Sequence, residues 1–141
     1  MRLLSSGLEL IFIDFMKNNN KNILYIHQYF KTPNDPGGTR SYWLAQALIK
    51  NGYNVTMLTS SSTIKNNVEK TIIDGINVIY LKVVYNQKMS FYQRLFSFLI
   101  FMFKSIYYAF LQKNIDLVFA TSTPLSVGFP ALIIKKIKKI P

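Results

Sequence analysis

The sequence predicts an α/β protein in which a Rossmann-like parallel sheet is flanked by helices. Short β-rich apolar runs alternate with segments of helical spacing, which is the pattern of strands joined by crossover helices. Two prolines and a glycine pair separate the first such run from the first helical segment. The chain has 141 residues, half of them apolar, which suits one domain with a buried core.

The first strand–helix–strand unit is the clearest part of the pattern. Residues 23–26 and 55–59 have the length and composition of buried strands, and the strands should be parallel with a right-handed crossover. Thr39 can cap the helix between them, and Asn51-Gly52 ends it. Four apolar residues share one face of this helix: Trp43, Leu44, Ala47 and Leu48.

A polar loop is expected through residue 70, and a hairpin or short edge strand follows it. Asp74-Gly75 between β-rich runs is a strong signal for a tight turn. The remaining elements are expected at residues 71–73, 76–81, 91–112, 115–120 and 132–139.

The segment 91–112 is long, aromatic and largely apolar, and a narrow polar stripe runs along it. The stripe consists of Arg94, Ser97, Lys104, Tyr108 and Gln112, with Phe101 interrupting it. Three interpretations stay open: a transmembrane helix, a buried crossover helix, and a helix that packs on the sheet while presenting aromatic and basic side chains to a bilayer.

The net charge of +11 predicts an acidic partner such as an anionic membrane surface or a phosphorylated substrate. Nucleic acid is not the predicted partner, because the basic residues are dispersed and no binding module is present. The absence of cysteine excludes disulfides and thiol catalysis. No metal-ligand cluster, closely spaced carboxylate pair, P-loop or dinucleotide fingerprint occurs, so no metal and no bound cofactor is predicted.

Gly37, Gly38 and Arg40 form the first group of candidate substrate-binding residues. A glycine pair entering a helix exposes backbone N–H groups that favour a phosphate or carboxylate, and Arg40 can add a forked cationic donor. The alternative is that the two glycines only make a tight turn.

His27, Thr121, Ser122 and Thr123 form the second group, since each follows a predicted strand. The carboxyl ends of parallel strands are where ligand sites gather. His27 can hydrogen-bond a sugar hydroxyl or carry a proton near neutral pH. The alternatives are a structural histidine, and hydroxyl groups that satisfy strand-end and helix-start backbone groups.

Five stretches together resemble the start of a family 4 glycosyltransferase, most closely the O-antigen and capsule type that transfers amino sugars. These are residues 27–30 (His-Gln-Tyr-Phe), 37–40 (Gly-Gly-Thr-Arg), 47–53, 54–59 and 120–126. The family usually has His and Glu where Tyr53 and Asn54 stand here. The catalytic residues remain unknown.

The resemblance implies the N-terminal, acceptor-side half of a two-domain GT-B enzyme in surface polysaccharide synthesis. The full enzyme would use a nucleotide-sugar donor and a lipid-linked glycan acceptor, in the cytoplasm at the inner face of the cell membrane. We expect residues 1–21 to be an extension with Met16 as the true start, and residues 22–141 to be a partial domain that is inactive alone. The alternative is a non-enzymatic basic peripheral membrane-binding protein.

Overall fold

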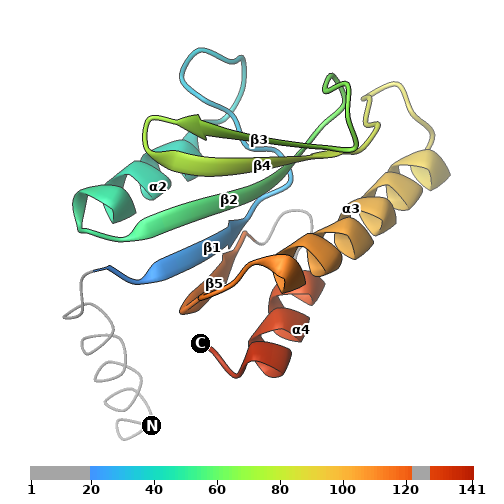
Figure 1. Ribbon diagram of the computed structural model, residues 1–141. Coiled ribbons are helices and arrows are strands. Elements are labelled where there is room, and N and C mark those ends of the chain that lie inside the picture. The colour runs from blue at the N-terminus through green and yellow to red at the C-terminus, as the bar shows by residue number, and fades with distance from the viewer. Residues whose placement is uncertain (1–19, 122–127) are drawn as a thin grey trace, which may run out of the picture.

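A computed structural model describes residues 20–121 and 128–141. A five-stranded, mostly parallel sheet lies between helices, in the strand order β3-β4-β2-β1-β5 (Figure 1). The strands are β1 (Asn22–Ile26), β2 (Asn54–Ser61), β3 (Val68–Ile73), β4 (Ile76–Lys82) and β5 (Leu117–Ala120). The predicted α/β class is therefore confirmed. Most of the extension predicted at residues 1–21 lies outside the described residues.

The centre of the sheet is β1, which is parallel to both β2 and β5, while β4 is parallel to β2. Only β3 is antiparallel, and it forms the edge hairpin predicted at Asp74-Gly75. Both turn residues have positive φ, +48° at Asp74 and +83° at Gly75, as a tight primed turn requires. The predicted polar loop is shorter than expected, because β3 begins at Val68 rather than at residue 71.

Helix α2 (Arg40–Lys50) covers one face of the sheet. Its Tyr42 and Ala45 pack on apolar side chains of β1, β2 and β4. The apolar face named from the sequence is not the buried one, since Trp43 and Leu44 are exposed. Thr39 is the N-cap residue of α2, as predicted, but its side chain makes no capping hydrogen bond. The left-handed residue predicted after the helix is present at Gly52, with φ +87°.

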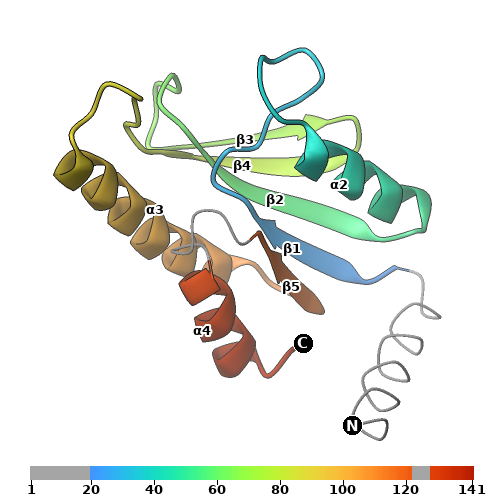
Figure 2. The ribbon, with the colours of Figure 1, turned by 180° about the vertical axis from the view of Figure 1, so that it is seen from behind.

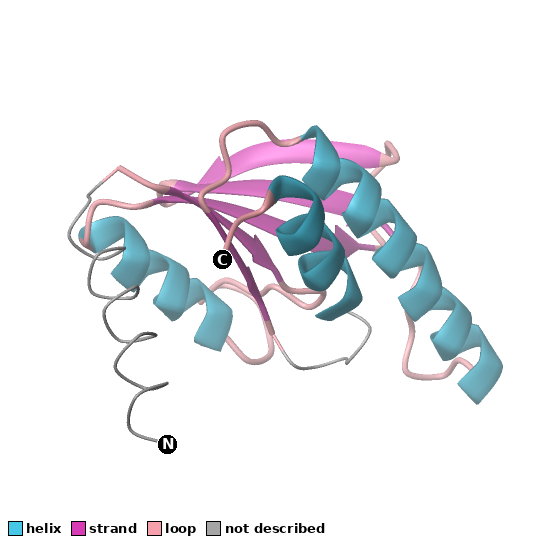
Figure 3. Cartoon of the chain, turned by 90° about the horizontal axis from the view of Figure 1, so that it is seen from below, coloured by secondary structure: helices cyan, strands magenta, loops and turns pink. Residues whose placement is uncertain are grey.

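Helices α3 (Phe91–Leu111) and α4 (Gly128–Lys138) lie side by side against the other face (Figures 2 and 3). Phe101, Ala109 and Ile134 are fully buried against residues of β1, β2 and β4. A capping box begins α3: the Ser90 hydroxyl accepts from the backbone N–H of Gln93, and the Gln93 side chain returns the bond. Thus α3 is the crossover between β4 and β5.

Candidate functional site

The carboxyl ends of four parallel strands meet at one edge of the sheet. Ile26 at the end of β1 pairs with Leu58 of β2 and with Ala120 of β5, so the following loops begin close together. The chain leaves β1 for β2 on one side and later returns to β5 on the other. Ligands of open α/β sheets bind outside the strand ends at such a reversal of order. This edge is the candidate site.

One hollow at this edge lies over the ends of β1 and β5, and we name it the histidine hollow. Tyr25, His27, Arg40 and Thr121 are among its walls, and its volume is about 380 Å³. The Nδ1 atom of His27 lies 2.8 Å from the Thr121 hydroxyl oxygen. Three residues predicted from the sequence, His27, Arg40 and Thr121, are therefore brought together.

Burial lowers the pKa of His27 below its ordinary value, and a backbone hydrogen bond at Tyr29 opposes that effect. The imidazole is therefore neutral at pH 7, with one nitrogen donating and the other accepting hydrogen bonds. The charge in the hollow comes from the guanidinium of the exposed Arg40. A neutral ring beside a forked cation can contact a hydroxyl and a phosphate at the same time.

The glycine pair is not part of this group. Gly37 and Gly38 are exposed in the loop before α2, and neither lines the histidine hollow. Gly37 has φ +128°, which favours glycine, whereas a Cβ on Gly38 would meet nothing within 4 Å. Of the predicted trio, only Arg40 reaches a hollow at this edge. The other two candidates, Ser122 and Thr123, lie outside the described residues.

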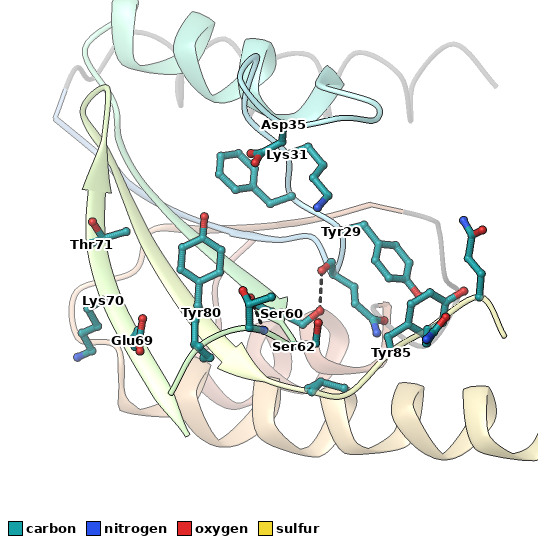
Figure 4. Close-up of a pocket in the computed structure, with 18 residues that line it drawn as sticks. Tyr29, Lys31, Asp35, Ser60, Ser62, Glu69, Lys70, Thr71, Tyr80 and Tyr85 are labelled. Atoms are coloured by element: carbon teal, nitrogen blue, oxygen red, sulfur yellow. Dashed lines mark hydrogen bonds between the residues drawn. The ribbon is translucent and has the colours of Figure 1, made fainter. Parts of the chain in front are cut away.

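A larger cavity of about 780 Å³ lies beside the histidine hollow, and we name it the hydroxyl cavity. Its walls come from segments 28–31, 60–64 and 85–87, which follow β1, β2 and β4, and from β3 and β4. Figure 4 shows Ser60, Ser62 and Tyr80 on one side and Tyr29 and Tyr85 on another. None of its lining residues is among the substrate-binding residues predicted from the sequence.

Gln28 is the most unusual residue of the hydroxyl cavity. It is fully buried, and its backbone oxygen accepts hydrogen bonds from the hydroxyls of Thr59 at 3.0 Å and Ser60 at 2.8 Å. Its side-chain atoms Nε2 and Oε1 are also buried, yet neither has a hydrogen-bond partner among the described residues. A buried amide without partners is destabilising, and this one belongs to a residue that lines the cavity.

Charge in the hydroxyl cavity is balanced, because its lining contains two lysines, Lys31 and Lys70, and two acidic residues, Asp35 and Glu69. Hydrogen bonds from the backbone N–H and hydroxyl of Thr32 lower the pKa of Asp35, so that carboxylate is ionised at neutral pH. The cavity as a whole therefore favours a neutral polar ligand over a strongly charged one.

Two phenols of the cavity, those of Tyr80 and Tyr29, stay protonated. Burial raises the pKa of Tyr80, and the nearby charge of Asp35 adds to that shift. Burial also raises the pKa of Tyr29, with a further contribution from the neighbouring Tyr85. Both side chains therefore keep a hydroxyl group that can donate a hydrogen bond at any physiological pH.

The aromatic wall of the cavity is held from α3. The rings of Tyr29 and Tyr85 are 5.2 Å apart, and Tyr85 stacks on Phe98 of α3 with ring centres 6.0 Å apart. Arg94 of α3 donates from Nε to the Met89 carbonyl and from a terminal nitrogen to the Gln87 carbonyl. These contacts fix the 85–89 segment and with it one side of the cavity.

A signal for the hydroxyl cavity exists in the sequence. The Ser60-Ser61-Ser62-Thr63 run follows a strand, and small hydroxyl residues at that place suit a ligand edge. A solvated linker has the same composition, so the run alone does not predict a cavity.

Among the described residues, no group of three or more His, Cys, Asp or Glu side chains is placed to hold a metal ion. No model of a known protein family matches the chain, and no curated protein matches it in sequence.

Proposed function

We propose that the chain is the acceptor-side part of a glycosyltransferase and that the hydroxyl cavity receives the sugar of the acceptor. The observation that carries this proposal is the amide of Gln28, which is buried, lines the cavity and has no partner among the described residues. A sugar hydroxyl both donates and accepts hydrogen bonds, so adjacent hydroxyls of one ring can satisfy Nε2 and Oε1 together.

The rest of the cavity suits the same ligand. Ser60, Ser62 and Tyr80 supply further hydroxyl partners, and the Tyr29 and Tyr85 rings supply apolar surface for the C–H face of a sugar. The balanced charge of the walls does not favour a bare phosphate here. A volume of about 780 Å³ is enough for a saccharide of one or two rings.

The phosphates of a nucleotide-sugar donor would lie at the histidine hollow. Arg40 stands at the start of α2, where the helix dipole favours an anion, and its guanidinium is exposed. As a neutral ring, His27 would hydrogen-bond either the donor substrate or the acceptor substrate. In the full enzyme, sugar would pass from the nucleotide to a hydroxyl of a lipid-linked or glycan acceptor in surface polysaccharide synthesis.

A second candidate is a basic peripheral membrane-binding protein without enzymatic activity. The apolar outer surface of α3, where Phe96 and Phe103 are 65% and 64% exposed, favours it. The two candidates differ in what they predict for sugars, since only the first requires the hydroxyl cavity to bind one.

Saturation-transfer NMR on the full chain tests the proposed function, with the methyl glycosides of glucose, galactose and N-acetylglucosamine as probes. We expect at least one glycoside to receive saturation at millimolar concentration, and the signal to disappear in Gln28→Met. Gln46→Met is the matched control, because the Gln46 amide already donates to the Asp74 carbonyl at 2.8 Å. Equal signals in both variants, or none for any glycoside, would overturn the proposal.

The donor half is tested separately with UDP as the probe. We expect UDP to bind weakly and Arg40→Ala to abolish that binding, while glycoside binding is unchanged. If Arg40→Ala leaves UDP binding unchanged, the histidine hollow is not the site of the donor.

A further inference from the structure

Helix α3 is polar on the side that faces the protein. The Ser97 hydroxyl donates to the Val84 carbonyl at 2.6 Å, and the Lys104 ammonium donates to the Lys82 carbonyl at 2.6 Å. Arg94 is likewise engaged with backbone carbonyls of the preceding loop. The polar stripe read from the sequence is therefore the inner face, with Phe101 buried among its members.

The outward side of α3 is consequently apolar, and we name it the aromatic face. Its members recur every three or four residues along the helix: Tyr92, Phe96, Leu99, Phe103, Tyr107 and Phe110. Each is at least 39% exposed. By length and composition α3 is apolar enough to cross a membrane, and only 22% of its apolar 18-residue stretch is buried within the protein. The exposed apolar strip is roughly 30 Å long, and a contiguous exposed apolar surface of this kind marks an interaction site.

Helix α4 extends the same surface and adds charge. Leu132 and Ile137 are exposed on it, and Lys135 and Lys136 are exposed beside them. The Lys138 ammonium donates to the Gln112 carbonyl and lies over the Phe110 ring, which joins the end of α4 to the end of α3. Figure 2 shows α4 beside the C-terminal end of α3, so the lysine-rich end of α4 lies near the helix that carries the aromatic face.

The sign of the charge is uniform over this half of the molecule. From Phe91 to the end of the chain there are seven Lys or Arg residues and a single acidic residue, Asp116. The Asp116 carboxylate accepts a hydrogen bond from the backbone N–H of Asn22 at 2.7 Å. An apolar surface bordered by unopposed lysines is complementary to an anionic lipid layer.

We propose that the aromatic face lies flat on an anionic bilayer, with α3 in the plane of the headgroups and the α4 lysines on the lipid phosphates. A spanning orientation would break the bonds of Ser97 and Lys104 and strip α3 from the sheet. A second copy of the chain would bring two sets of lysines together, which is unfavourable. This inference rests on the second candidate function, for which it specifies the lipid charge and the orientation of α3, and it needs no sugar.

Vesicle flotation of the full chain tests it, with phosphatidylcholine vesicles containing or lacking phosphatidylglycerol. We expect flotation with the anionic vesicles and little with the neutral ones. Phe96→Ser/Phe103→Ser should lower the partition coefficient by about tenfold or more. Trp43→Ser/Ile72→Ser removes two comparably exposed apolar side chains elsewhere, 58% and 70% exposed, and should leave flotation unchanged.

The charge contribution has its own variant. Lys135→Gln/Lys136→Gln should weaken binding to anionic vesicles by about tenfold, and added salt should weaken the parent chain in the same direction. Because all these residues are exposed, thermal melts should show the variants folded. The proposal is overturned if the parent chain does not float with anionic vesicles, or if the two double substitutions of apolar residues give equal flotation. A dimer in gel filtration that Phe96→Ser/Phe103→Ser dissociates, without flotation, would assign the aromatic face to a second copy. Neither result would affect the glycoside experiment.

Discussion

The substitution Gln28→Met should make the protein more stable and at the same time less able to bind sugar. Gln28 is 0% exposed, and its two amide atoms are unpaired among the described residues. Each unpaired buried polar atom costs about 1–3 kcal/mol. Methionine keeps the length and flexibility of the side chain and needs no hydrogen bonds. We therefore expect the free energy of unfolding to rise by about 2 kcal/mol, or roughly 6–10 °C in Tm.

Urea denaturation followed by circular dichroism measures this change, with Gln46→Met as the reference. Gln46 loses a real hydrogen bond to the Asp74 carbonyl, so its substitution should lower stability by about 0.5–1.5 kcal/mol. The two glutamines should thus respond with opposite signs. A loss of stability of about 1 kcal/mol or more in Gln28→Met would show that the Gln28 amide is satisfied within the protein, and the argument for a ligand there would fail.

Three further results are expected. His27 is the only histidine, and its pKa is lowered in the folded protein, so the stability that it contributes is present above its unfolded pKa of 6.5 and is lost as the pH falls below that value. The drop in Tm from pH 7 to pH 5 should therefore be smaller in His27→Gln than in the parent chain. An equal drop in both would refute the burial of His27. Gly75→Ala places a side chain at φ +83° and should lower the free energy of unfolding by about 1 kcal/mol. Gly38→Ala should change the free energy of unfolding by less than about 0.5 kcal/mol, because a Cβ there meets nothing within 4 Å. Equal effects of the two substitutions would contradict the turn geometry. Phe101→Ala should cost about 3–5 kcal/mol in urea denaturation and Phe103→Ala almost nothing, and a reversal would mean that the helix face is wrongly assigned.

Much of the fold follows from local patterns in the sequence. Asp74-Gly75 specifies a tight turn because both residues tolerate positive φ, and the structure has positive φ at both. The short apolar runs specify buried strands for a related reason, since a parallel sheet covered on both faces needs continuous apolar residues. The left-handed position at Gly52 was likewise predictable from residue type alone.

The orientation of the helices was less predictable. On α2, Trp43 was grouped with the apolar face, yet it is 58% exposed while Tyr42 is buried and donates to the Asp74 carboxylate at 2.6 Å. On α3, the polar stripe usually marks the solvent side of a helix. Here Ser97 and Lys104 instead donate to backbone carbonyls at the end of β4 and just after it, a partnership that only the tertiary structure reveals.

The candidate site was predicted in part. Side chains that directly follow β1 and β5 could be placed at one edge from topology, which is why His27 and Thr121 meet. Gln28 was not singled out, because a glutamine after a strand usually reaches solvent and only its burial makes it informative. Gly37 and Gly38 were predicted from their residue type, and neither is among the residues that line the histidine hollow or the hydroxyl cavity.

The side-chain amide resonances of Gln28 give the most direct test of the account. A ¹⁵N–¹H spectrum of the full chain identifies them as the NH₂ pair that Gln28→Met removes. On titration with the methyl glycoside that shows the strongest saturation transfer, we predict that this pair shifts together with the backbone amides of residues 60–63. If the pair stays in place while the glycoside binds elsewhere, the hydroxyl cavity is not the acceptor site.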